Sequence, residues 1–493
     1  MVNPALVDPD TVRATAAEAW IRAQPVLRTY RRLYAQAVDE ADPSYLGGFG
    51  VFRHQPRPPT PADTPTGSPT GSPTGTEAAT ATATVRAPAV RAAAVRAPAA
   101  RAGAEATAAV GSEAGDTPYS RAWLDLRAEP WVVSVPAEDR YYVLPVQELD
   151  TVYAGFIGSR TTGPEAGHHL VAGPDWKGEP PPGIRSVTRT ATRLVGIPGR
   201  TRLTGGTAAE AAELAAVQER YRLRPLHEYA GTPAPDPAPE PVWPVWREEI
   251  PDGLEFLSLL DFLLGFFPPA GPVPLPPAET DLRGRLTDLG VDGRGEFEPA
   301  ALPLEVRAEI ERGIADGRAR LQAALAGLRD RFGLSGTREQ IGGDFLRQAV
   351  SAVVDPDGLP TEEVWCDSWQ ADSAGHRPPN AADRDHVIRF APDALPPARF
   401  AWSASLYELS GELHRMVDNT LDRYSIGDRT PGLVRDPDGG LTLHIRHKRP
   451  ADADHSANWL PAPDGPFTVV LRLYGPDRAA LDGSWRLPPL DPR

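Results

Sequence analysis

The clearest strand signal lies near the end of the chain, in the run Phe467-Thr468-Val469-Val470-Leu471-Arg472-Leu473-Tyr474. Successive side chains of a strand point to opposite faces of a sheet, so this alternation predicts a strand with one face in a core. The run Leu441-Thr442-Leu443-His444-Ile445-Arg446 alternates in the same way. Asp438-Gly439 and Asp464-Gly465 precede the two runs and are typical of hairpin turns. We therefore expect a β module over residues 355–493.

Upstream of this module the apolar spacing changes from two residues to three and four. Two apolar stripes have this helical spacing: Val306, Ile310, Ile314, Leu321, Leu325 and Leu328, then Ile341, Phe345, Ala349 and Val353. The turn sequence Asp355-Pro356-Asp357-Gly358 follows them and ends the helical part. These patterns predict a helical segment over residues 251–354.

The N-terminal half combines one helix with further strands. Residues Asp10 to Glu40 have helical spacing, with Asp10 as the expected N-cap and Pro25 expected to kink or split the helix. Short strands are predicted at Trp131–Val135, Tyr141–Val146 and Thr151–Ile157. The proline-rich stretch that follows predicts a linker over residues 231–250.

A low-complexity insert interrupts this half at residues 56–115. It repeats Pro-Thr-Gly-Ser and spaces Arg86, Arg91, Arg96 and Arg101 five residues apart in an Ala/Val/Pro background. Five-residue steps do not return to one face of a helix. Since large apolar residues are almost absent, we expect the insert to be disordered.

The composition excludes several functional classes. The 493 residues carry 51 basic and 66 acidic side chains, a formal charge of −15, which argues against a nucleic-acid binder or a binder of anionic membranes. A single cysteine, Cys366, rules out an intrachain disulfide and a thiolate zinc cluster. The opening residues show no secretory signal, and no apolar stretch is long enough to span a bilayer, so a cytoplasmic location is expected.

Two groups of short strings give a family resemblance. The first group resembles domain of unknown function 1254: Asp116-Thr117-Pro118-Tyr119-Ser120, Ala122-Trp123-Leu124-Asp125-Leu126, Asp139-Arg140-Tyr141-Tyr142, Gly158-Ser159-Arg160-Thr161-Thr162-Gly163 and Ala172-Gly173-Pro174. The second resembles its usual partner, domain of unknown function 1214: Leu421-Asp422-Arg423-Tyr424-Ser425-Ile426-Gly427-Asp428-Arg429-Thr430-Pro431, Asn458-Trp459-Leu460-Pro461-Ala462-Pro463 and Leu481-Asp482-Gly483-Ser484-Trp485. The resemblance implies a bacterial protein with no established chemistry.

The resemblance also implies a multidomain, mainly β fold with a helical segment. It leads us to expect an immunoglobulin-like β-sandwich, a helical middle and a jelly-roll β-sandwich. The expected divisions are 1–55 (N-terminal helix and start of the first module), 56–115 (insert), 116–230 (immunoglobulin-like sandwich), 231–250 (linker), 251–354 (helical segment) and 355–493 (jelly roll).

The candidate ligand-binding residues come from the same strings. Arginine offers a planar fork of donors suited to a carboxylate or phosphate, and an aspartate beside a tyrosine can move a proton. The candidates are Asp116, Tyr119, Arg140, Tyr142, Arg160, Arg423, Tyr424, Asp428 and Arg429. The alternative is that the same arginines hold carboxylates and carbonyls at turns and at the domain interface.

Metal and cofactor sites are not predicted. The chain has no Gly-x-Ser-x-Gly, phosphate-loop, His-Glu-x-x-His or EF-hand motif. His168 and His169 would lie on opposite faces of a strand, and Asp452, Asp454 and His455 are better explained as a solvated loop.

Two functions from different classes follow from these observations. In the first, the protein binds a small molecule in a cleft between its β modules, and the arginines would suit an anionic one. Whether it also transforms that molecule, and so is an enzyme, stays open. In the second, it is a non-catalytic interaction or scaffold protein whose Arg, Asp and Trp motifs join the modules. Ligand identity and oligomeric state are not encoded in any pattern found.

Overall fold

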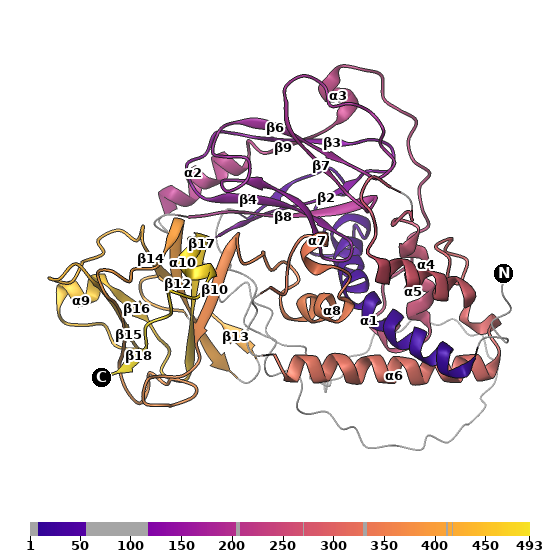
Figure 1. Cartoon of the computed structure of the whole chain (residues 1–493). Coiled ribbons are helices and arrows are strands. Elements are labelled where there is room, and N and C mark those ends of the chain that lie inside the picture. The colour runs from indigo at the N-terminus through magenta and orange to yellow at the C-terminus, as the bar shows by residue number, and fades with distance from the viewer. Residues whose placement is uncertain are drawn as a thin grey trace, which may run out of the picture.

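The computed structural model describes residues 8–55, 117–203, 208–269, 271–328, 333–410, 413–416 and 418–493. The predicted insert at 56–115 and the candidate Asp116 lie outside these ranges. The chain forms two β modules and a helical part, with the C-terminal module, in orange and yellow, beside the other two (Figure 1). This arrangement is multidomain and rich in β structure, as predicted.

The first β module contains two sheets. Its strands are β1 (Arg53–His54), β2 (Tyr119–Asp125), β3 (Trp131–Val135), β4 (Tyr142–Glu148), β5 (Tyr153–Gly158), β6 (Gly167–Ala172), β7 (Ile184–Arg189), β8 (Leu194–Thr201) and β9 (Arg222–Pro225), with helices α2 (Ala208–Gln218) and α3 (Leu226–Ala230). One sheet has the order β1-β2-β8-β4-β5 and the other β7-β6-β3-β9. Residues of both sheets, among them Leu124, Val133, Leu144 and Val171, share one buried core.

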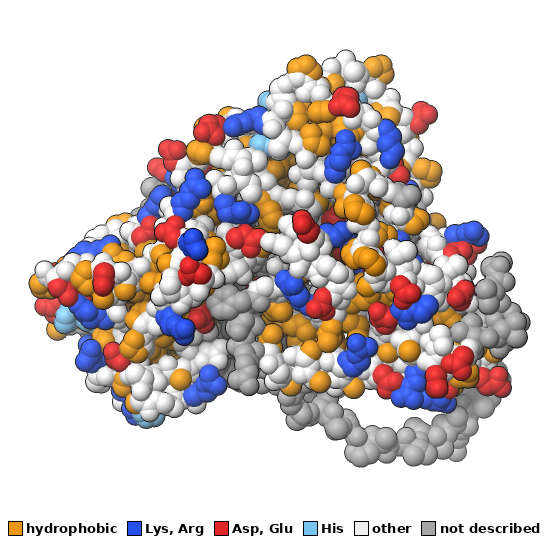
Figure 2. Space-filling view, in the orientation of Figure 1, with side chains coloured by type: hydrophobic (Ala, Val, Ile, Leu, Met, Phe, Trp, Pro, Cys, Tyr) orange, Lys and Arg blue, Asp and Glu red, His pale blue; other side chains and the backbone are white. Residues whose placement is uncertain are grey.

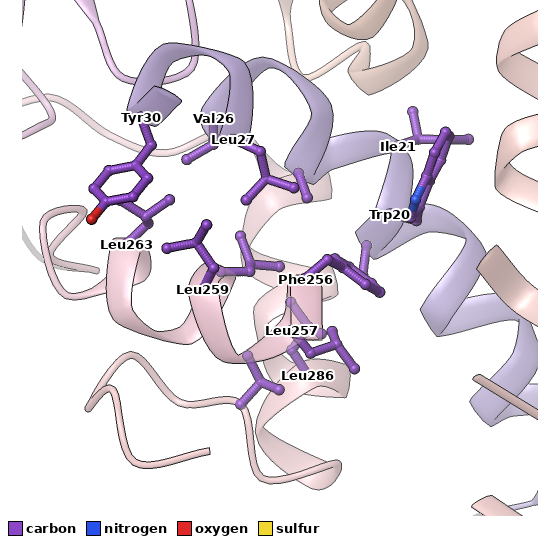
Figure 3. Close-up of a cluster of buried hydrophobic side chains, with 14 of the residues drawn as sticks. Trp20, Ile21, Val26, Leu27, Tyr30, Phe256, Leu257, Leu259, Leu263 and Leu286 are labelled. Carbon is purple, nitrogen blue, oxygen red and sulfur yellow. The ribbon is translucent and has the colours of Figure 1, made fainter. Parts of the chain in front are cut away.

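The helical part takes its first helix from the N-terminal end. Its elements are α1 (Pro9–Leu33), the π-helical turn η2 (Tyr34–Val38), η4 (Ile250–Asp252), α4 (Glu255–Leu264), α5 (Pro277–Asp288), η5 (Pro299–Ala301), α6 (Leu304–Ala326), α7 (Arg338–Ile341) and α8 (Phe345–Val354). Helix α1 packs against α4, α5, α6 and α8. Figure 3 shows Leu27 and Tyr30 of α1 facing Leu259 and Leu263 of α4.

The predicted N-cap of the first helix was wrong, and of the two outcomes predicted for Pro25 the split is excluded. The N-cap is Asp8, whose carboxylate accepts the N–H of Thr11, and Asp10 lies in the first turn. Pro25 does not split the helix, because α1 runs unbroken from Pro9 to Leu33. Proline removes one backbone hydrogen bond, and the buried residues on both sides of it supply enough packing to keep the helix continuous.

The predicted linker contains no regular element between Ala230 and Ile250. It nevertheless packs on the helical part, since the Trp243 ring stacks on Phe266 at a centroid distance of 5.8 Å. The hydroxyl of Tyr30 also donates to the carbonyl of Pro244 at 2.6 Å.

The C-terminal module again contains two sheets around one core. Its elements are β10 (Val364–Trp369), β11 (His386–Phe390), β12 (Ala398–Ser410), β13 (Leu413–Arg415), β14 (Ser425–Gly427), β15 (Leu441–Arg446), α9 (Ala453–Ala457), β16 (Trp459–Pro461), β17 (Phe467–Pro476), α10 (Arg478–Leu481) and β18 (Leu490–Pro492). One sheet has the order β10-β17-β12-β13, with β14 also on β12, and the other β16-β15-β11-β18. The predicted strand at Phe467–Tyr474 is confirmed as part of β17, and its apolar set lies in this core.

The surface carries both signs of charge. On the face shown in Figure 2, the Lys and Arg side chains are interspersed with Asp and Glu. Among the described residues, no helix is both long and apolar enough to cross a membrane.

Candidate functional site

Several predicted site residues serve as ties inside or between modules. Arg160 donates to the buried carboxylate of Glu363, which also accepts the Tyr141 hydroxyl at 3.0 Å. Because Glu363 directly precedes β10, this triad joins the first β module to the C-terminal one. Burial raises the pKa of Glu363, although the Arg160 guanidinium opposes this shift.

The strongest string of the C-terminal half forms local clamps. Arg423 donates to the carbonyls of Ala457 and Trp459 at 3.0 and 2.9 Å, which fixes its turn to the neighbouring strand β16. The Tyr424 hydroxyl lies 3.4 Å from Asp422, and burial, the largest cause, raises its pKa. These groups already have partners within their own module.

Asp428 and Arg429 lie where the two β modules meet. The Asp428 carboxylate accepts the backbone N–H of Trp402 at 3.0 Å and a guanidinium N–H of Arg202, a residue of the first module, at 3.3 Å. Arg429 is 43% exposed at its side chain and approaches Asp428 only to 3.9 Å. The structural tie is therefore made by Arg202, and Arg429 contributes little to it.

Arg140 and Arg429 come together from different modules. They line an open cavity of about 400 Å³ with Ala137, Glu138 and Asp139. Arg140 is already paired with Glu138 and with Glu213 of α2. Among the described lining residues the two arginines are balanced by two acidic residues, so these residues offer no net positive charge to an anion.

Tyr142 and Tyr119 are fully buried. The Tyr142 hydroxyl donates to the carbonyl of Gly163 at 3.1 Å, and burial raises its pKa. Tyr119 lies under the guanidinium groups of Arg121 and Arg200, 4.0 and 4.9 Å from its ring centre. Tyr119 thus supports arginines that the sequence did not single out.

Arg121 borders a larger cavity of about 500 Å³. We call it the arginine recess; it lies between the end of α1, the edge of the first sheet and the turn that opens the C-terminal module. Its lining residues are Arg32, Gln36, Pro43, Ser44, Tyr45, Leu46, Arg53, Gln55, Arg121, Pro356 and Asp357. A narrow throat of about 10 Å³ adjoins it and shares four of these residues, Arg32, Gln36, Arg121 and Asp357.

Asp357 forms the floor of the arginine recess. Its carboxylate accepts one guanidinium N–H from Arg32 and another from Arg121, the latter at 2.6 Å. Its backbone carbonyl accepts an N–H of Arg200, also at 2.6 Å. Burial alone would raise the pKa of Asp357, but Arg32 and Arg121 outweigh it and hold the pKa well below its usual range.

This recess is not predicted by any pattern of the sequence. Arg32 lies in no predicted site, Asp357 belongs to a sequence that predicts a turn, and Arg53 and Arg121 are separated in sequence by residues 56–116. Only the pairing of β1 with β2 sets Arg53 directly opposite Arg121.

Metal ligation has no support in the described part of the chain. No group of three or more His, Cys, Asp or Glu residues there is arranged to hold a metal ion. Asp452 accepts the backbone N–H of His455 at 2.9 Å and caps α9.

Comparisons with known proteins agree with this organisation. Along 98% of its length the chain is similar to the whole VPA0106 protein from Vibrio parahaemolyticus, whose crystal structure is known, with a TM-score of 0.71 and 23% identity. That similarity shows a shared fold. A protein of Burkholderia cenocepacia described as uncharacterized is 14% identical over 98% of this chain and 93% of its own, with a TM-score of 0.39, too low to support an argument. No curated protein matches the chain.

Two family models, each described as a protein of unknown function, match separate parts of the sequence. The model for DUF1254 matches residues 94–225, which include most of the first β module. The model for DUF1214 matches residues 366–478, within the C-terminal module. The chain is thus a two-module protein that combines an N-terminal DUF1254 domain with a C-terminal DUF1214 domain.

Proposed function

We propose that this protein binds a small anionic molecule in the arginine recess. The observation that carries the proposal is the cross-strand pair Arg53 and Arg121. Residues directly opposite in an antiparallel pair share one face of the sheet with Cβ atoms about 5 Å apart, where like charges repel. Asp357 already pairs with the Arg121 guanidinium, and an anion bound between Arg53 and Arg121 would lower the repulsion that is left between them.

The charge balance of the recess supports the same proposal. Of the described residues, three arginines and one aspartate line it, and together they carry a net charge of +2. The chain as a whole carries −15, so a cationic recess is a local departure from the overall charge. Arginine suits carboxylates and phosphates because its N–H groups form a planar fork.

The proposal is limited to binding. Asp357 is held ionised by two guanidinium groups, and a carboxylate with a lowered pKa is a weak general base at neutral pH. The hydroxyl of Ser44, the other candidate at the rim, already donates to Asp42. Neither group is arranged to start a reaction.

The experiment compares anion binding by matched arginine variants. Calorimetric titration with inorganic phosphate and succinate, with mass spectrometry of co-purified small molecules, gives the wild-type ligand set. Arg53→Gln should weaken binding about tenfold or more, the effect of losing one charge-assisted hydrogen bond. Arg31→Gln removes an exposed arginine paired with Glu248 and is the control. Equal affinities of wild type and Arg53→Gln would contradict the proposal.

The alternative function is a scaffold that only joins its modules. The Arg160–Glu363–Tyr141 triad and the Arg202–Asp428 pair favour it, since both cross the junction. On this alternative no anion binds with an affinity that depends on Arg53.

Finer assignments also belong to the proposal. The two packed sheets in each β module support an immunoglobulin-like sandwich for the first and a jelly roll for the second. A cytoplasmic location is part of the proposal, and the net charge of −15 supports a lack of nucleic-acid or membrane partners.

A further inference from the structure

Asp357 differs from every other group around the arginine recess. Among the described residues that line the recess and its throat, it is the one carboxylate. The residue is 4% exposed, so it lies at the floor and not at the rim. A ligand that fills the recess therefore meets Asp357 at its inner end.

The Asp357 carboxylate keeps hydrogen-bonding capacity. Oδ1 accepts one N–H from Arg32 and Oδ2 one N–H from Arg121. A carboxylate offers about four acceptor positions in total, so each oxygen can accept once more. Since Arg32 and Arg121 hold the group ionised, it accepts hydrogen bonds and donates none.

The neighbouring amides are less available. The Gln147 side chain accepts from Arg32 at 3.3 Å and donates to the carbonyl of Pro356 at 2.7 Å. The Gln36 carbonyl oxygen accepts the indole N–H of Trp123 at 2.9 Å. The floor therefore selects its ligand chiefly through Asp357.

An ionised acceptor at the floor and cationic groups nearer the rim select different parts of a ligand. Arg53, which is exposed, lies at the rim and attracts an anionic group. At the floor, a fully ionised second anionic group has no hydrogen to donate to the Asp357 carboxylate, whereas a hydroxyl or ammonium group does.

We propose, on the basis of the proposed function, that the ligand carries a hydrogen-bond donor beside its anionic group. The chemical class is a hydroxy acid, an amino acid or a hydroxylated phosphate ester. Asp357 is the specificity-determining residue for the donor, and Arg53 with Arg121 holds the anion.

The test uses pairs of anions that differ by one hydroxyl group. Affinities of the full-length protein are measured for L-malate against succinate, L-lactate against propionate, and glycerol 3-phosphate against propyl phosphate. We expect the hydroxylated member of at least one pair to bind about tenfold to a hundredfold more tightly, the range for a charge-assisted hydrogen bond. Asp357→Asn should reduce this preference to near parity. Asp316→Asn, which removes a carboxylate paired with Arg13 on the surface, is the matched control.

The outcomes separate this inference from the proposed function. Equal binding of both members of every pair by the wild type, with weaker binding of both by Arg53→Gln, would overturn the inference and leave anion binding intact. Binding of phosphate with no binding of any hydroxylated anion would overturn it too. Failure of phosphate and of all six organic anions to bind would overturn the proposed function. The comparison of pairs in the wild type decides the matter even where Asp357→Asn fails to fold.

Discussion

Arg202 and Arg429 both lie near the carboxylate of Asp428, but they differ in how deeply their side chains are buried. Arg202 is buried, donates to Asp428 and to the carbonyl of Trp402, and stacks over Tyr474 at 5.5 Å. Arg429 has a side chain 43% exposed, 3.9 Å from the carboxylate. Depth therefore decides which arginine stabilises the junction.

Replacement of each arginine by alanine tests this difference. Arg202→Ala should lower the free energy of unfolding by about 2–3 kcal/mol, because buried polar partners lose a charged donor. Arg429→Ala should change it by less than about 1 kcal/mol, as exposed ion pairs do. Urea denaturation of both variants measures the two values, and a larger loss for Arg429→Ala would show that the assignment is wrong.

A buried charge network ties α1 to α5. Arg22 donates to Glu279 at 2.5 Å, and Arg283 donates to the same carboxylate at 2.9 Å. Burial alone would raise the pKa of Glu279, but the two guanidinium groups outweigh it and lower the pKa to about 2. A lowered carboxyl pKa stabilises the folded state above the unfolded-state pKa of about 4.3, and this contribution is lost as the pH falls toward 2.

The pH dependence of stability should change when Glu279 is replaced. Between pH 5 and pH 2, wild type should lose about 3 kcal/mol more than Glu279→Gln, which has no carboxylate to protonate. Asp281→Asn on the same helix removes an exposed carboxylate and should keep the wild-type slope. Urea midpoints across this range measure the slopes; parallel curves for wild type and Glu279→Gln would contradict the assignment.

At the scale of elements, the close approach of α1 and α6 depends on glycine. A Cβ atom at Gly313 would lie 2.5 Å from the carbonyl oxygen of Arg13 and 2.6 Å from the Cβ of Ala16. Both obstacles are backbone or the first side-chain atom, so neither can rotate away. The helices must separate to admit a methyl group.

Gly313→Ala should therefore destabilise the protein by about 1–3 kcal/mol through overpacking. Gly284→Ala in α5 is the matched control, since beyond the adjoining residues and backbone of its own helix nothing lies within 4 Å of the added Cβ. The control should be neutral or more stable by about 0.5–1 kcal/mol, because alanine favours a helix over glycine. Thermal unfolding that ranks the two variants in the opposite order would contradict the packing account.

The elements that were predicted best from the sequence are those whose apolar residues recur at one regular spacing. The strand at Trp131–Val135 is confirmed as β3, and the long stripe from Val306 is confirmed in α6. Strand β8 was missed because Gly196, Pro198 and Gly199 interrupt its pattern, and they are tolerated because the strand is buried between two neighbours. A local sequence pattern shows the spacing of apolar residues, but it does not show that neighbouring strands stabilise a segment.

The candidate site was harder to predict than the fold. The strings that carry the family resemblance mark turns and junction ties, and the candidates Arg160 and Arg423 lie in such ties. The arginine recess depends on a cross-strand register and on the docking of Asp357, both of which are long-range. Neither the register nor the docking can be recognised in a short stretch of the sequence.

At the scale of the whole molecule, the chain positions on either side of residues 56–115 lie beside each other, at the paired strands β1 and β2. His54 is opposite Ser120, and the N–H of Gln55 donates to the carbonyl of Tyr119 at 2.7 Å. The two ends are therefore close enough for a short loop to join them. The composition of the segment, with almost no large apolar residue, offers little to a core.

Replacement of residues 56–115 by a short glycine-containing loop should leave the melting temperature within about 3 °C of wild type, the shift that roughly 1 kcal/mol produces in a domain of about 150–250 residues. Differential scanning calorimetry measures it. A larger fall would show that the segment stabilises the fold.

The first β module, the helical part and the turn at Asp357 meet around the arginine recess, and the central claim is that an anion binds there. The most direct measurement is an anomalous difference map from crystals grown with selenate, a tetrahedral oxyanion. The account predicts a selenium peak between the guanidinium groups of Arg53 and Arg121, absent in Arg53→Gln crystals. An empty recess in crystals whose other exposed arginines carry selenate would contradict it.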